Sequence, residues 1–311
     1  MRRFLLNRLL EMVLTLLALS LIVFLAVHAT GDPARVLAGD NPLITPEVFR
    51  ELEERWGFSD PMPIQYLKFL RSVATALDFG DSLSLNRPVR DIVLERAPYT
   101  IQLALVGMLI AVVLGVPAGV VAALRRGSWI DSAIRLVAVV SLATPGFWLA
   151  SMLILFFAAT LGWLPAFGAG DPTHLILPGV TVALPVAAGI ARITRSSMLD
   201  VLGSDYVRFA RIKGLREWRV IWKHALRNVA IPVVTFGGLG LAGLLNGSIV
   251  VEVVFAWPGL GRLMVQGVLL RDVPLVLATT LLSASMFILT AFVVDVLYAY
   301  IDPRIRYGSR R

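Results

Sequence analysis

Six long apolar runs alternate with polar segments along the chain. Each run holds roughly 20 or more mainly apolar residues, which is the length that an α-helix needs to cross the hydrocarbon core of a bilayer. The pattern therefore predicts an all-α integral membrane protein with six transmembrane helices in a single domain, 1–311. We place the spans at about residues 9–29, 99–124, 132–161, 175–195, 230–254 and 275–300. Prolines inside three of these runs predict kinks at Pro117, Pro145 and Pro185.

The first run follows a basic start, MRRFLLNR, and ends near the sequence VHA, which resembles a signal-peptidase site. Its apolar core, residues 12–27, is about as long as a span and longer than the usual signal core of about 7–15 residues. We interpret the run as an uncleaved anchor.

The longest polar segment, residues 30–98, contains two shorter helical patterns. TPEVFRELEERWGF (45–58) starts with Thr45 as a helix cap and Pro46 in the first turn, and PIQYLKFLRSVATAL (63–77) predicts a second helix. These helices either pack on the membrane surface or form a docking surface for an external partner.

Composition supports the membrane class. The chain is 57% apolar and 16% charged, with a mean hydropathy of +0.78, whereas ordinary soluble domains carry about 25% charged residues. The absence of cysteine excludes disulfides and thiolate metal sites, and three scattered histidines make no metal cluster. The net charge of +8 is explained by membrane topology, so we expect no nucleic-acid partner.

The charges predict the orientation. The N-terminus, the 125–135 turn, the 192–227 segment and the tail hold 19 Lys/Arg and 6 acids, against 10 and 14 in the other loops. Excess Lys and Arg marks cytoplasmic loops, so we expect both termini and the 199–228 loop in the cytoplasm and 30–98 outside. Asp295, near the inner end of the last span, either pairs with an Arg or extends to the interface.

Several kinds of chemistry are missing. A phosphate-binding loop needs a Gly-Lys pair followed by Ser or Thr, and none of the three lysines follows a glycine. The sequence also lacks the GxSxG and HExxH patterns of serine hydrolases and zinc proteases. We therefore expect a non-catalytic chain that binds no cofactor or metal itself.

A basic amphipathic stretch, FARIKGLREWRVIWKHALRNVAIP (209–232), lies between the fourth and fifth spans. Its apolar residues recur every three or four positions, which indicates a helix, but Gly214 interrupts it. A helix lying on the membrane needs no such break, whereas glycine suits the left-handed cap of a short helix, with a second helix starting near Arg216. The pattern predicts a compact knob that docks on a partner.

Five motifs, the first of which overlaps this stretch, are spread along the chain. They are DYVRFARIKGL (205–215) with HALRN (224–228) and IPVVT (231–235), EVVFAWPGLGRL (252–263) with RDVP (271–274), DFGDS (78–82), RPV (87–89) and DPRIR (302–306). With these motifs the whole chain resembles the B-type permease subunits of dipeptide/oligopeptide/nickel ABC importers. The first motif is similar to their cytoplasmic EAA loop, although Arg208-Phe209-Ala210 departs from the general Glu-Ala-Ala pattern as that subgroup does.

The resemblance implies a type I importer (MetI-like) permease fold in the inner membrane of a bacterium or archaeon. It implies a second, homologous permease, two cytoplasmic ATPases that hold ATP and Mg, an external solute-binding protein, and a peptide or related small solute. The residues implied to couple to an ATPase are Asp205, Tyr206, Arg208, Phe209, Ala210, Arg211, Ile212, Lys213, Gly214 and Leu215. Among them, Ala210 and Gly214 would be small for close docking, and Phe209, Ile212 and Leu215 would be apolar anchors.

The resemblance also suggests an outer gate or a docking surface for the binding protein, although turn chemistry alone explains Pro258-Gly259. Its residues are Phe255, Trp257, Pro258, Gly259, Gly261, Arg271 and Asp272, and the polar candidates for the pathway are Asn246, Ser248, Ser283 and Ser285. GVPAG (115–119) and GLLNG (243–247) predict either close helix packing or a line of small residues beside a pathway or interface.

Two other classes remain open at this point. A self-sufficient secondary carrier or channel would show charged groups within its spans, and the span centres here are nearly free of charge. A membrane scaffold would use the basic knob only to hold anionic lipid.

Overall fold

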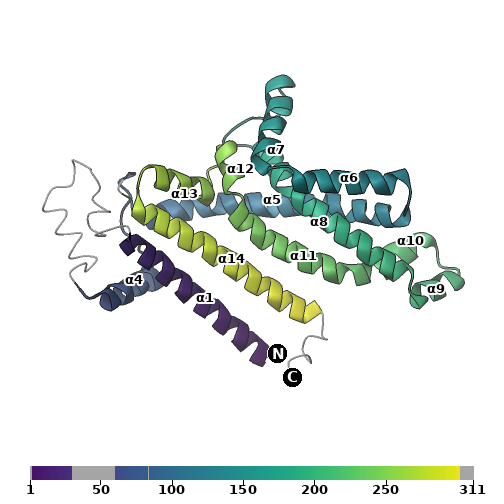
Figure 1. The fold of residues 1–311 in the computed structure, drawn as a ribbon, viewed down its shortest axis with the longest axis horizontal. Coiled ribbons are helices and arrows are strands. Elements are labelled where there is room, and N and C mark those ends of the chain that lie inside the picture. The colour runs from purple at the N-terminus through teal and green to yellow at the C-terminus, as the bar shows by residue number, and fades with distance from the viewer. Residues whose placement is uncertain (1, 30–59, 83, 302–311) are drawn as a thin grey trace.

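The computed structural model describes residues 2–29, 60–82 and 84–301, which form helices packed side by side (Figure 1). Within these residues, five segments are long and apolar enough to cross a membrane, and one bent helix pair brings the number to as many as six. The predicted all-α membrane fold is therefore confirmed. The bent pair corresponds to the third predicted span. The five long helices are α1 (Arg2–Ala29), α5 (Val89–Leu124), α8 (Ile176–Leu202), α11 (Leu226–Gly247) and α14 (Val273–Ile301).

The bent pair replaces the third predicted span. α6 (Trp129–Ala143) ends before Pro145, and α7 (Gly146–Leu153) continues into η1 (Ile154–Thr160), a π-helix. The two halves meet at 107°, and α7 stands away from α6 in Figure 1. The kink predicted at Pro145 is therefore present within the span predicted over 132–161, because a proline cannot donate the backbone hydrogen bond that would join the halves. By contrast, α5 and α8 continue through their internal prolines.

Glycines let the long helices approach closely in one row, from α5 to α8, α11 and α14. A Cβ on Gly119 of α5 would lie 2.5 Å from the carbonyl oxygen of Ala191 in α8. A Cβ on Gly238 of α11 would likewise collide with Val294 of α14. The GVPAG pattern therefore serves close packing. Gly243 of the second pattern differs, since no described atom lies within 4 Å of where its Cβ would be.

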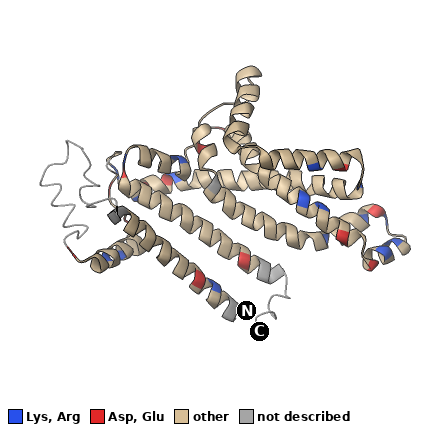
Figure 2. Ribbon diagram, viewed as in Figure 1, with Lys and Arg blue, Asp and Glu red and all other residues tan. Residues whose placement is uncertain are grey.

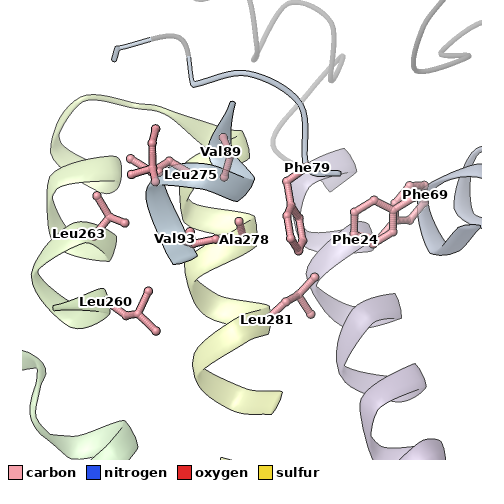
Figure 3. Close-up of a cluster of buried hydrophobic side chains, with 11 residues drawn as sticks. Phe24, Phe69, Phe79, Val89, Val93, Leu260, Leu263, Leu275, Ala278 and Leu281 are labelled. Carbon is pink, nitrogen blue, oxygen red and sulfur yellow. The ribbon is translucent and has the colours of Figure 1, made fainter. Parts of the chain in front are cut away.

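One end of the molecule holds three shorter helices, α4 (Met62–Ala76), α12 (Ile249–Val254) and α13 (Leu260–Leu269). Figure 3 shows the apolar cluster that joins α1, α4, α5, α13 and α14 there. α5 begins at Val89, ahead of the predicted start at 99, because Val89 and Val93 are buried in this cluster. α4 confirms the helix predicted over 63–77, while the one predicted over 45–58 lies outside the described residues.

The opposite end carries α9 (Asp205–Ile212), α10 (Glu217–Arg219), η3 (Val220–Ala225, a π-helix) and the turn between α5 and α6. Figure 2 shows Lys and Arg gathered around α9 and α10, with the long helices mostly uncharged. Arg8 of α1 lies 3.4 Å from the carboxylate of Asp295 in α14. Of the two alternatives for Asp295, the structure thus favours pairing with an arginine.

Candidate functional site

The short helix α9 ends in a glycine cap. Gly214 has a φ of +74°, its N–H donates to the carbonyl of Arg211 at 2.9 Å, and the N–H of Leu215 donates to the carbonyl of Ala210 at 3.3 Å. This pair of hydrogen bonds is the Schellman arrangement that terminates a helix with a left-handed residue. The predicted cap at Gly214 and the second helix starting after Arg216 are both confirmed.

Beneath the cap, the loop has a small apolar core of its own. Val207, Ala210 and Val220 are buried together, and Leu215 packs against them. Ala210 and Leu215 therefore hold the loop together rather than face outwards, which differs from the docking and anchoring roles expected of them. The small side chain of Ala210 lets α9 approach η3.

Two apolar side chains of α9 remain outside this core. Phe209 is 63% exposed and Ile212 is 79% exposed. Arg208 and Lys213 are exposed beside them, and Arg208 lies 3.8 Å from Asp205. Two of the three expected apolar anchors, with basic neighbours, are therefore present on the surface of α9.

Two polar contacts fasten α9 to the chain that follows it. The Arg211 guanidinium lies 2.7 Å from the Glu217 carboxylate, and this hydrogen bond is the main reason that the pKa of Arg211 is raised. The Asn228 amide donates to the hydroxyl of Tyr206 at 2.6 Å. Arg211 and Tyr206 therefore act partly within the loop, and α9 is held against the start of α11.

An ion pair that the sequence analysis missed lies between α6 and α8. The buried carboxylate of Asp131 accepts from Nε and Nη2 of Arg195 at 2.7 and 2.8 Å, and from the N–H of Gly127 at 3.1 Å. Because α8 leads directly into α9, this pair joins the basic loop to α6. In the sequence, the pair appears only as one acidic and one basic residue beside apolar runs. That pattern does not show that the two residues are partners.

At the other end, Glu252 is a second group that the sequence analysis passed over. Its buried carboxylate accepts from the hydroxyls of Thr100 and Ser248, each at 2.9 Å, and from the N–H of Arg262 at 3.1 Å. A Cβ on Gly259 would collide with this carboxylate, and one on Gly261 would lie 3.0 Å from it. Gly259 is thus small because Glu252 occupies the space, and Gly261 is small mainly because Ile249 lies even closer to it, at 2.7 Å.

Two residues that were expected in an outer gate or docking surface also have structural roles. Phe255 and Trp257 are buried, and the Trp257 indole donates to the carbonyl of Tyr99 at 2.9 Å. Pro258 is half-buried and Arg271 is exposed. Because they are buried, Phe255 and Trp257 belong to a packed core rather than to an open docking surface.

Asp272 is buried at the start of α14. Its carboxylate accepts from Ser82 Oγ at 2.5 Å, from Ser84 Oγ at 2.7 Å and from the N–H of Leu275 at 3.2 Å. Asp272 therefore caps α14 and ties it to the turn that precedes α5.

The four pathway candidates differ in their exposure and in their bonding. Ser248 is bonded to Glu252, Asn246 is exposed, and Ser285 donates to the carbonyl of Leu281 at 2.6 Å within its own helix. Ser283 is half-buried. A groove between α5, α11 and α14 is lined by apolar residues and Thr290, and none of the four candidates lines it.

Comparisons with known proteins agree with this architecture. Residues 115–307 match the family described as "Binding-protein-dependent transport system inner membrane component", and residues 1–104 match its N-terminal companion. The glutathione transport system permease protein GsiC of Escherichia coli K12 is 46% identical over 308 residues, which cover 99% of this chain and 100% of that protein. GsiC of Salmonella paratyphi A is 44% identical over the same coverage.

A solved structure has the same fold. An inward-facing structure of the MetNI methionine ABC transporter matches 68% of this chain and 96% of its own chain, with a TM-score of 0.58 and 19% identity. The relatives are permease subunits of ABC importers, in which the ATPase is a separate subunit, so this chain is a non-catalytic, multi-pass component of the inner membrane. The chain therefore belongs to the family of binding-protein-dependent transport system inner membrane components, as a permease subunit of an ABC importer of the peptide/nickel class.

Proposed function

We propose that the importer carries short peptides, with glutathione as the first candidate, and that this chain forms one half of the pathway beside a second, homologous permease. The solute is supported by the full-length similarity to permeases named for glutathione transport. Two ATPases with ATP and Mg drive the cycle, and an external binding protein delivers the solute. Both termini and the basic loop lie in the cytoplasm of a bacterial or archaeal cell, in keeping with the excess of Lys and Arg there.

The observation that carries the proposal is the capped helix α9 with its exposed apolar pair. Phe209 and Ile212 fit an apolar groove on an ATPase, with Arg208 and Lys213 at the rim. ATP binding draws the two ATPases together and displaces α9. Such a displacement does useful work only if the ATPases bind its two positions with different affinity.

The contacts around α9 support transmission of that movement. The Arg211–Glu217 and Tyr206–Asn228 bonds make α9 move with α11. Through α8, the Asp131–Arg195 pair passes the same displacement to α6.

Co-purification tests this function. The tagged chain, extracted from native membranes with detergent, should retain a second permease and the ATPases. Changing Phe209 and Ile212 to alanine together should remove the ATPases and leave the second permease bound. The matched control changes Val268 and Leu269 of α13, which are exposed to a similar degree, 58% and 77%, at the opposite end of the molecule; it should retain the ATPases.

Two results would overturn the proposal. Retention of the ATPases by the Phe209/Ile212 variant would remove α9 as the docking helix. Recovery of the chain alone, still moving glutathione into vesicles without ATP, would establish a self-sufficient carrier. Uptake of labelled glutathione by the reconstituted complex with its binding protein tests the solute separately.

A further inference from the structure

Two exposed tryptophans lie next to α9 but outside its apolar pair. Trp218 and Trp222 are 68% and 37% exposed, and their ring centroids are 5.0 Å apart. Between them, Val220 and Ile221 are buried against α9 and α8. One side of this segment is thus packed on the protein, and the two indoles, tilted by 41° to each other, lie on its exposed side.

Basic side chains surround the indole pair. Arg216, Arg219 and Lys223 are exposed, and none of them takes part in a salt bridge within the described residues. The one nearby acid, Glu217, is engaged by Arg211. We call Trp218, Trp222, Arg216, Arg219 and Lys223 the tryptophan patch. It combines aromatic rings with net positive charge.

The helix that carries the patch is longer than the hydrocarbon core. The continuous segment Glu217–Asn246 has 30 residues, which corresponds to about 45 Å of helix at 1.5 Å per residue. The hydrocarbon core measures about 30 Å, and about 40–45 Å with the headgroups. The charged start of the segment, up to Arg227, is the part that lies beyond the hydrocarbon. On an untilted helix the tryptophan patch would therefore lie at or just beyond the layer of lipid headgroups, and tilting of the helix would bring it closer.

We propose that the tryptophan patch binds anionic phospholipid headgroups of the cytoplasmic leaflet. Indoles partition to this layer, where one end of the ring is apolar and the other polar, and exposed Lys and Arg are attracted to the negative surface of that leaflet. The contact fixes the height of α9 relative to the bilayer while Phe209 and Ile212 remain available to the ATPase. The inference rests on the cytoplasmic placement of this loop in the proposed function.

Quenching by brominated lipid tests the contact. The complete transporter is placed in nanodiscs whose phosphatidylglycerol or, separately, phosphatidylcholine carries bromine close to the headgroup. We expect stronger quenching of tryptophan emission by the anionic lipid, and loss of that extra quenching when Trp218 and Trp222 are changed to phenylalanine.

Charge variants complete the test. R216Q/R219Q/K223Q should lose the preference for phosphatidylglycerol, whereas R208Q/K213Q, which removes charges of α9 in the same loop, should keep it. Quenching that is unchanged by the double phenylalanine variant would overturn the proposal. A second result would also overturn it: the emission of Trp218 and Trp222 is never quenched by lipid and changes only when ATPase is added. The patch would then be a surface that contacts the ATPase.

The two proposals fail in different measurements. Normal ATP-driven uptake with no lipid quenching would remove the lipid contact and leave the coupling role of α9 intact. Lipid quenching by a chain that never co-purifies with an ATPase would remove the coupling role and leave the contact.

Discussion

Gly214→Val should strongly reduce ATP-driven uptake while the chain still inserts into the membrane. At a φ of +74°, a side chain with a Cβ costs about 1–2 kcal/mol, and a β-branched one is tolerated least. No described atom lies within 4 Å of the new Cβ, so the effect arises from the backbone. The cap unwinds, and α9 loses its fixed direction. Uptake into proteoliposomes measures the loss, and we expect a reduction of about tenfold or more, which corresponds to 1.4 kcal/mol.

Two variants separate this cause from general strain. Gly162→Val places the same side chain at a φ of +65°, again with no described atom within 4 Å, in a turn remote from α9; it should keep uptake. Gly214→Asn should restore much of the activity, because asparagine adopts the left-handed region more readily than valine. Equal uptake by the Gly214→Val and Gly162→Val variants would show that the cap does not couple the ATPase to the spans.

Glu252→Ala should destabilise the end of the protein that holds α12 and α13. The hydroxyls of Thr100 and Ser248 and the N–H of Arg262 all donate to this buried carboxylate. Each donor left without a partner costs about 1–3 kcal/mol, and the lost side chain also leaves a cavity. We expect little folded protein after detergent extraction, measured as the monodisperse fraction in size-exclusion chromatography. Glu252→Gln should be destabilising too. The amide N–H₂ of glutamine is itself a donor, so it would face one of these donors instead of accepting a hydrogen bond from it.

The control is an acid near the same end of the protein. Glu95 of α5 is 55% exposed and pairs with Arg87, and an exposed pair contributes about 0–1 kcal/mol. Glu95→Ala should therefore extract and unfold like the unaltered protein. If Glu252→Ala behaved in the same way, the hydrogen bonds of Glu252 would not stabilise the packing of α5, α12 and α13.

Local signals explain what the sequence predicted well. An apolar run of about 20 residues has one stable arrangement in a bilayer, so the spans were identified without knowledge of their contacts. Gly214 was recognised as a cap because its left-handed conformation is a property of one residue and its immediate neighbours. The motifs of the basic loop and the outer loop then identified the family.

Contacts between distant segments explain what was missed. Thr100 and Glu252 are 152 positions apart, and Asp131 and Arg195 are 64 apart; no local pattern pairs them. Ala210 was taken for a docking residue because the sequence does not show which face of α9 packs on Val220. Pro145 predicted a kink, but an angle as large as 107° depends on the tertiary contacts of α7, such as the burial of Ala150 beside Leu177.

The close contacts at glycines hold the row of long helices together as one rigid unit. Sliding of α5 along α8, or of α11 along α14, would drive Ala191 or Val294 into a neighbouring backbone. We therefore expect the four helices to move together as one rigid body during transport. The chain has no cysteine, so spin labels on Leu109→Cys and Leu289→Cys, both exposed positions, would report this directly. Their separation should stay constant throughout the ATP cycle.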